Sequence, residues 1–150
     1  MTVFYEDLRV GRKFVSGPRS LSREEIEGFG RLTGDMNRLH TDEAYARTTV
    51  FRGSVAHGLL VLSAALGLWY GMNLTRDSLV ALLGINGVSF EAPVRPGARF
   101  RLKSKVQSRR PSNSRPNAGI VTLKDTVTGE RGERLLEFER VLLVKRRPKK

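Results

Sequence analysis

One run of residues limits the folds open to this chain more than any other: His57 to Asn73 reads as a helix that is apolar on nearly every side. A helix with a polar face can lie on a protein surface, whereas one that is apolar all round has to be covered by other structure. Ser63, Gly67 and Gly71 interrupt the run, which therefore falls short of the ~20 apolar residues that a membrane span needs. We expect a buried central helix.

The chain beyond this helix predicts strands. The first segment is apolar, as in a central strand, and the next two alternate polar with apolar residues, as in a sheet with one buried face. In the last segment Arg140 interrupts an apolar face. A buried helix followed by antiparallel strands predicts an α+β domain, with an antiparallel sheet wrapped around a long central helix. The strands are expected at 79–90, 100–106, 120–127 and 135–144.

A further helix is predicted after Leu21. Ser22 and Glu25 form a capping box, in which each side chain accepts a hydrogen bond from the backbone N–H of the other. Gly34 suits the end of this helix, because glycine readily adopts the left-handed conformation that helix ends use. The helix therefore delivers the chain directly into Asp35.

The segment GDMNRLH, residues 34–40, crowds together the groups that proton transfer near neutral pH needs: the Asp35 carboxylate, the Asn37 amide and the His40 imidazole. Gly, Asp and Asn favour turns. A compact turn would bring Asp35 and His40 to one side, which an ideal helix does not do for residues five apart. The alternative is that Asp35 and Asn37 are only turn formers and that His40 is structural.

A second candidate piece, GSVAHG at residues 53–58, leads into the apolar helix. If that helix begins near Gly58, its first N–H groups have no intrahelical acceptor. Together with the helix dipole, they suit a developing oxyanion. The alternative interpretation of Gly58 is that it only permits close packing. His57 is interpreted either as a partner for Asp35 or as a residue that starts the helix.

Composition limits the kinds of protein and of functional site that this chain can form. The 150 residues suit one globular domain. The absence of cysteine excludes disulfides and thiolate chemistry, and two histidines make a His-rich metal site unexpected. The first residues lack the apolar core of a signal peptide, so a cytoplasmic location without membrane attachment is expected.

The net charge of +12 calls for an anionic partner or a solvated basic face. The range 92–123 holds no acidic residue, and residues 145–150 read KRRPKK. A phosphate-bearing ligand, a membrane surface and nucleic acid are the candidate partners. We find no helix-turn-helix pattern, so nucleic acid is not expected.

In combination, four motifs resemble those of the MaoC-like dehydratases, also called R-specific enoyl-CoA hydratases. They are GDMNRLH, AHGLL, FEAPVRPG at 90–97 and SNSRPNAGIV at 112–121, spread in order over roughly residues 21–144. The resemblance implies a single hot-dog domain at 1–144 and a homodimer or higher oligomer with substrate bound between subunits. The charges of KRRPKK indicate a basic tail at 145–150.

The resemblance also implies an activity: hydration of an enoyl thioester or dehydration of the 3-hydroxyacyl thioester. Asp35 and His40 would be catalytic, and Gly58, Asn37 and His57 would hold the substrate or its oxyanion. No cofactor or metal is implied, because coenzyme A is part of the substrate. The acyl group would be carried by coenzyme A or by an acyl carrier protein.

One departure from the family pattern is Arg38, which stands where the family usually has proline. Proline would fix φ in the turn, whereas Arg38 is expected to place a cation near Asp35. Two other functions stay open: an acyl-CoA thioesterase on the same fold, or a non-catalytic acyl-CoA-binding module.

Overall fold

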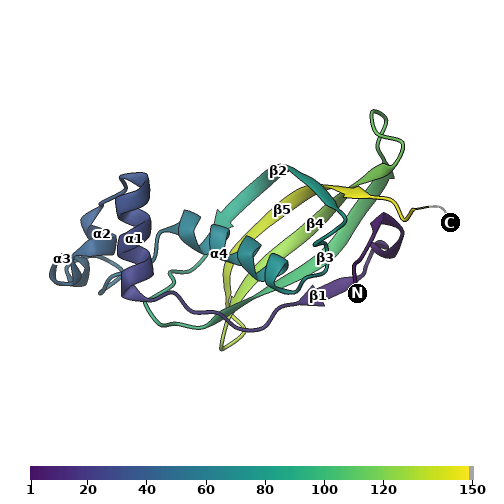
Figure 1. Cartoon of the computed structure of the whole chain (residues 1–150). Helices are drawn as coiled ribbons and strands as arrows, with labels where there is room; N and C mark the ends of the chain where they lie inside the picture. The colour runs from purple at the N-terminus through teal and green to yellow at the C-terminus, as the bar shows by residue number, and fades with distance from the viewer. Residues whose placement is uncertain (149–150) are drawn as a thin grey trace.

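The apolar run forms the longest helix, α4 (Gly58–Gly71), which lies across one face of a curved antiparallel sheet (Figure 1). The computed structural model describes residues 1–148. Within these residues the sheet has five strands in the order β1-β3-β4-β5-β2. They are β1 (Lys13–Val15), β2 (Leu79–Phe90), β3 (Phe100–Pro111), β4 (Ala118–Gly129) and β5 (Arg134–Lys145). The predicted α+β fold, with a sheet around a central helix, is confirmed.

The core lies between α4 and the inner face of the sheet. Along β4, β5 and the Phe100–Val106 part of β3, most alternate side chains are buried, as the alternating sequence predicts. Val61, Leu62, Ala65 and Trp69 of α4 pack against them. On its other side α4 leaves Leu59 and Tyr70 exposed. The expectation that α4 is buried on most sides is therefore wrong for the single chain, because the sheet covers only one side of the helix.

The apolar strand β2 was expected at the centre of the sheet, and this is also wrong. Among the strands of the described residues it pairs with β5 alone, and it forms one edge of the sheet. Its apolar side chains are largely exposed at Val80, Leu82, Leu83, Val88 and Phe90. Apolar composition by itself does not distinguish a strand buried in the sheet from an edge strand whose faces lie open.

The helix predicted after Leu21 is α1 (Arg23–Thr33). Its capping box joins Ser22 and Glu25, and Gly34 ends it with φ of 81°. Two short helices follow, α2 (Arg38–Thr41) and α3 (Glu43–Arg47). Figure 1 shows α1, α2 and α3 grouped beyond the start of α4, at the end of the molecule opposite the two termini. We call residues 23–56 the overhang.

The acid-free stretch supplies the outward face of β3. Arg101, Lys103 and Lys105 alternate outward along it. Across the strands, Lys105 lies directly opposite Lys13 of β1 on one side and Lys124 of β4 on the other. Three lysines therefore lie side by side across this face, and of these Lys124 forms an ion pair with Glu137 of β5.

The expected basic tail divides into three parts. Lys145 closes β5. Arg146 and Arg147 form ion pairs with Glu6 and Asp7, beside the short 3-10 helix η1 (Tyr5–Asp7). The last two residues of the tail, 149–150, lie outside the described residues. Within residues 1–148, no helix is both long and apolar enough to cross a lipid bilayer.

Candidate active site

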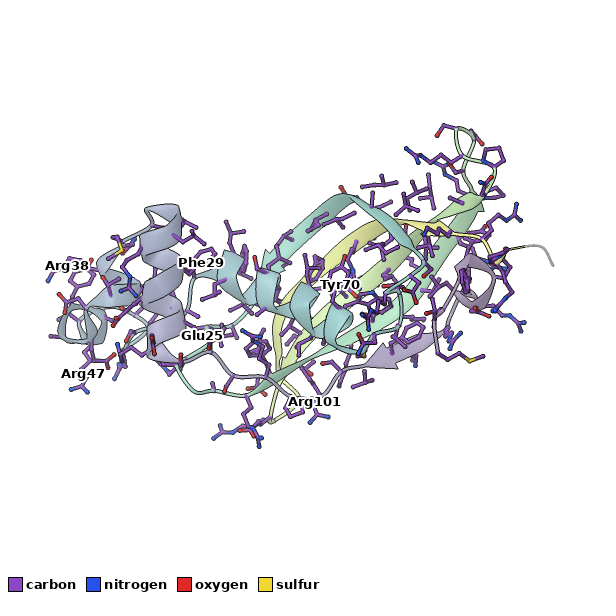
Figure 2. The ribbon with its side chains drawn as sticks, in the orientation of Figure 1. Glu25, Phe29, Arg38, Arg47, Tyr70 and Arg101 are labelled. Carbon is purple, nitrogen blue, oxygen red and sulfur yellow. The ribbon has the colours of Figure 1, made fainter. Side chains whose placement is uncertain are left out.

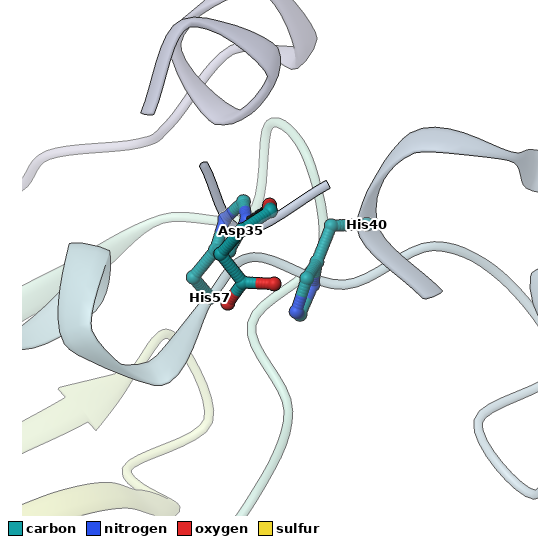
Figure 3. Close-up of side chains that lie close together, drawn as sticks. All are labelled: Asp35, His40 and His57. Carbon is teal, nitrogen blue, oxygen red and sulfur yellow. Dashed lines mark hydrogen bonds between the residues drawn. The ribbon is translucent and has the colours of Figure 1, made fainter. Parts of the chain in front are cut away.

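Two consecutive turns bring the groups of the GDMNRLH segment together. Gly34 ends α1 in the left-handed conformation, and the Asn37 side-chain oxygen then accepts the Leu39 N–H at 2.9 Å to start α2. As a result a carboxylate oxygen of Asp35 and one ring nitrogen each of His40 and His57 lie within 4.8 Å of one another. Figure 3 shows the three side chains gathered at one point. The predicted compact turn is confirmed.

His40 is half-buried and held by one strong contact. Its Nδ1 lies 2.7 Å from the backbone carbonyl oxygen of Val55. A carbonyl oxygen only accepts, so Nδ1 carries the proton. Nε2 is therefore the nitrogen left free to take part in proton exchange.

His57 is only 2% exposed and precedes the first residue of α4. Its Nε2 lies 2.9 Å from the backbone carbonyl oxygen of Asp35. Its ring stacks on that of His40, with centroids 3.8 Å apart and planes inclined by 30°. His57 thus starts the helix and also contacts Asp35, but through the backbone of Asp35 and not through its carboxylate.

One carboxylate and two imidazoles can also hold a metal ion, and the orientation of the two rings decides whether they would do so here. Imidazoles coordinate through lone pairs that lie in the ring plane. Stacked rings direct these lone pairs side by side instead of at one point, and one nitrogen of each ring is already bonded to a carbonyl group. The arrangement suits proton transfer better than chelation.

A cavity of about 480 Å³ opens beside these groups. Asp35, His40, His57 and Gly58 all lie on its wall, whereas Asn37 does not. The remaining wall is mostly apolar and comes from distant parts of the chain, including Phe29, Phe51, Leu59, Val61, Phe90, Ala92, Val94, Leu135 and Leu136. The sequence singled out none of these as site residues, since their apolar pattern is equally that of a core.

Gly58 begins α4 in a crowded place. A Cβ at this position would lie 2.5 Å from the ring of Phe90, so only glycine lets that ring pack against the helix start. The Gly58 N–H, at the first helical position, donates to no protein acceptor within residues 1–148. Close packing and a free N–H donor therefore occur together at Gly58.

Arg38 does not place its charge where we expected it. Its guanidinium forms an ion pair with Asp42 at 2.8 Å and lies over the ring of Tyr45, 4.3 Å from the centroid. No ion pair joins Arg38 to Asp35 in the part of the chain that the structure describes. Figure 2 shows Arg38 and Arg47 at the outer end of the overhang, away from the sheet.

Glu43 connects separate parts of the overhang by hydrogen bonds. Its carboxylate accepts hydrogen bonds from both the side chain and the backbone N–H of Ser54, and from Arg47 and Arg23. These bonds, those of Ser54 first, lower the pKa of Glu43 to about 2. Because Ser54 precedes Val55, this contact also fixes the backbone that binds His40.

Known proteins share this fold. A protein from Mycobacterium tuberculosis, whose structure is described as a double hotdog fold, superposes with a TM-score of 0.85 over 99% of this chain and 46% of its own, at 22% identity. The MaoC-like dehydratase from Rhodospirillum rubrum gives a TM-score of 0.85 over 98% of this chain and 99% of its own, at 29% identity. The fold is therefore a hot-dog fold.

The family follows from the sequence match. Residues 7–129 match the family model described as MaoC like domain. The (R)-specific enoyl-CoA hydratase of Rhodospirillum rubrum is 31% identical over 145 residues, which cover 94% of this chain and 91% of that protein. Protein MaoC of Klebsiella aerogenes is 28% identical over 100 residues, which cover 67% of this chain and 29% of that longer protein. This chain belongs to the MaoC-like family, as its motifs indicated.

Proposed function

We propose that this protein is an (R)-specific enoyl-CoA hydratase, which reversibly adds water across the 2,3 double bond of an enoyl thioester. One observation carries the proposal: the Asp35 carboxylate and the His40 imidazole meet on the wall of an apolar cavity that also contains the free N–H of Gly58. Relatives that bear the name (R)-specific enoyl-CoA hydratase support the same reaction class.

In the proposed reaction Asp35 and His40 hold one water molecule between them. Asp35 removes a proton from this water as its oxygen forms a bond to C3. The electrons of the C2=C3 bond move toward the thioester. Asp35 then returns the proton to C2, and the hydroxyl group stays on C3. General acid–base catalysis of this kind contributes on the order of 10²–10⁴-fold. Asn37 supports the reaction indirectly, because its side chain caps α2 and so shapes the turn.

The thioester oxygen gains negative charge as water adds. The Gly58 N–H, at the positive end of the α4 dipole, is the donor that we assign to it. A donor held by the helix backbone does not have to reorganise during the reaction. Loss of one such donor typically costs ~3–4 kcal/mol of transition-state stabilisation.

The test is hydration of crotonyl-CoA and of longer 2-enoyl-CoAs, followed as loss of the enoyl absorbance. Asp35→Asn and His40→Gln should each lower kcat by at least about 100-fold, because the first removes the proton acceptor and the second removes the imidazole that holds the water. Thiol release from saturated acyl-CoAs is measured in parallel. Release without hydration would establish the thioesterase alternative, and acyl-CoA binding without either reaction would establish the binding module.

Coenzyme A and acyl carrier proteins are both anionic, and the cationic chain suits either. Matched crotonyl thioesters of the two carriers distinguish them. The preferred carrier is the one with the higher kcat/KM.

We further infer that the functional unit is a homodimer joined along β2. An edge strand presents unpaired backbone N–H and C=O groups, and here it also exposes apolar side chains. Phe90 at its end and Leu59 of α4 both line the cavity and are both exposed. A second chain against β2 would therefore cover the open side of α4 and complete the cavity.

Size measurement in solution tests the dimer. Leu82→Lys with Val88→Lys should give a monomer of strongly reduced activity, because two charges would be buried at the interface. Val10→Lys, at an exposed apolar residue just before β1 at the opposite edge of the sheet, is the control and should leave the dimer intact. A wild-type protein that is monomeric and fully active would exclude this assembly.

A further inference from the structure

The buried imidazole of His57 has no part in the proton transfers proposed above. It is 2% exposed and contacts two groups of the site: the backbone carbonyl of Asp35, through Nε2 at 2.9 Å, and the ring of His40, through stacking at 3.8 Å. Its Nδ1 is buried and has no hydrogen-bond partner within residues 1–148. A polar group in such a place calls for an explanation.

These contacts determine where the protons are. The Asp35 carbonyl only accepts, so the His57 proton sits on Nε2. A second proton on Nδ1 would be a buried donor without an acceptor, which is costly. The Val55 carbonyl places the proton of His40 on Nδ1 in the same way. The stacked rings are thus opposite tautomers, each tied to a different backbone segment.

His57 lies next to Gly58 in the chain, so its contacts connect Asp35 and His40 to the start of α4. Its side chain holds the backbone of Asp35, the proposed base, and the next residue is Gly58, the proposed oxyanion donor. One residue therefore joins the two groups that would act at opposite ends of the conjugated enoyl thioester. The stacked ring of His40, the second group on the water, is held by the same side chain.

We propose that His57 is a positioning residue, which sets Asp35, His40 and the Gly58 N–H relative to one another through the hydrogen bond to the Asp35 carbonyl and the stack on His40. The inference rests on the proposed hydratase function for its kinetic consequence. The tautomers and the contacts of His57 are independent of which reaction the protein catalyses.

Two variants separate the two contacts. His57→Phe keeps an aromatic ring for the stack and loses the donor. His57→Gln keeps an N–H donor at a similar reach and loses the stack. A displacement of about 1 Å in a reacting group can cost about 100-fold. We expect His57→Phe to lower kcat by about 10- to 100-fold with KM little changed, and His57→Gln to retain more of kcat than His57→Phe.

Leu62→Ala is the matched control for lost stability. Leu62 is also buried on α4 but is not part of the cavity wall. It should lower the unfolding temperature while kcat stays close to that of the wild type. A fall in kcat as large as that of His57→Phe would show that loosening of α4, not positioning, accounts for the effect and would overturn the proposal.

The second readout is independent of turnover. NMR of protein labelled with ¹⁵N at histidine should show His57 as the Nε2–H tautomer and His40 as the Nδ1–H tautomer near neutral pH. In a uniformly ¹⁵N-labelled sample of His57→Phe, the amide signal of Asp35, 22 residues away in the sequence, should shift together with that of Gly58, because their connection is broken. The opposite tautomer at His57, or amide signals that do not move, would overturn the proposal.

The two proposals fail in different ways. A wild-type protein that hydrates no enoyl thioester but shows the expected tautomers and coupled amide shifts would contradict the hydratase function and leave the positioning contacts supported. An active wild type whose His57→Phe and His57→Gln variants keep full kcat would support the hydratase function and contradict the role of His57.

Discussion

Arg140 and Asp125 form an ion pair inside the protein core, with 2.7 Å between Nε and Oδ2 and with both side chains almost fully buried. They lie diagonally across the neighbouring strands β5 and β4. Ser104 of β3 donates to the same carboxylate, and Trp69 of α4 covers the guanidinium at 4.5 Å. Burial raises the pKa of the Asp125 carboxyl and lowers the pKa of the Arg140 guanidinium.

This pair predicts an asymmetry between single and double variants. Asp125→Ala should lower the free energy of unfolding by about 3–5 kcal/mol, because it leaves a buried cation without its partner. The double variant Asp125→Val with Arg140→Met should recover most of the loss, since apolar side chains can replace a buried pair at little cost. Urea denaturation measures both.

The matched control for the buried pair is Lys124 with Glu137, an ion pair of 2.6 Å that is partly exposed. Glu137→Ala should cost no more than about 1 kcal/mol, because solvent screens the pair. Equal losses in Asp125→Ala and Glu137→Ala would contradict the view that burial makes the difference.

A second prediction concerns Gly58→Ala. The added methyl group would lie 2.5 Å from the Phe90 ring, so the ring must swing away from the start of α4 and into the space of the cavity. We expect a folded protein with kcat/KM reduced at least about 10-fold, because a displacement of about 1 Å at the reacting centre is enough for such a loss. Adding Phe90→Leu should restore part of it.

Gly28→Ala provides the comparison within another helix. A Cβ at Gly28 of α1 meets only the end of Arg31, at 3.9 Å. This variant should gain about 0.5–1 kcal/mol of stability, from the higher helix propensity of alanine, and keep its activity. Loss of activity in Gly28→Ala comparable to that in Gly58→Ala would show that the effect is not specific to the start of α4.

Glu43 predicts a dependence of stability on pH. Its hydrogen bonds lower its pKa from 4.5 to about 2 in the folded protein. A carboxylate with a lowered folded-state pKa stabilises the protein fully above its unfolded-state pKa, and the contribution is lost as the pH falls toward the folded value. The stabilisation by Glu43 should therefore disappear between pH 4.5 and 2.

The comparison is between wild type and Glu43→Gln, each unfolded with urea at a series of pH values. The difference between their free energies of unfolding should be constant above pH 4.5 and should shrink below it. A difference that stays constant through the acidic range would mean that Glu43 acts only through its shape and uncharged hydrogen bonds.

The last prediction addresses the residue that departs from the family motif. Arg38→Pro should fold and keep activity within about 3-fold, because the first helical position tolerates proline. Asn37 before it has φ of −53° and ψ of 131°, an extended conformation compatible with a following proline. The lost ion pair to Asp42 is mostly exposed and contributes little. Loss of hydratase activity in this variant would show that Arg38 has a direct role in the site.

Local patterns in the sequence predicted much of this protein. The capping box of Ser22 and Glu25, the left-handed Gly34 and the start of α4 at Gly58 all occur where the sequence places them. Each depends on residues a few positions apart, so propensity and hydrogen bonding within one turn determine it. The motif around Asp35 and His40 predicted their approach for the same reason.

Contacts between distant segments were decided only by the tertiary structure. The sequence showed Arg140 as a break in an apolar face, but its partner Asp125 belongs to another strand. It showed β2 as apolar, but its place at the sheet edge follows from pairing with β5. His57 contacts Asp35 and His40 because α4 and the overhang pack together. Periodicity along one segment predicts which of its faces is buried, but it does not predict which other segment will lie against that face.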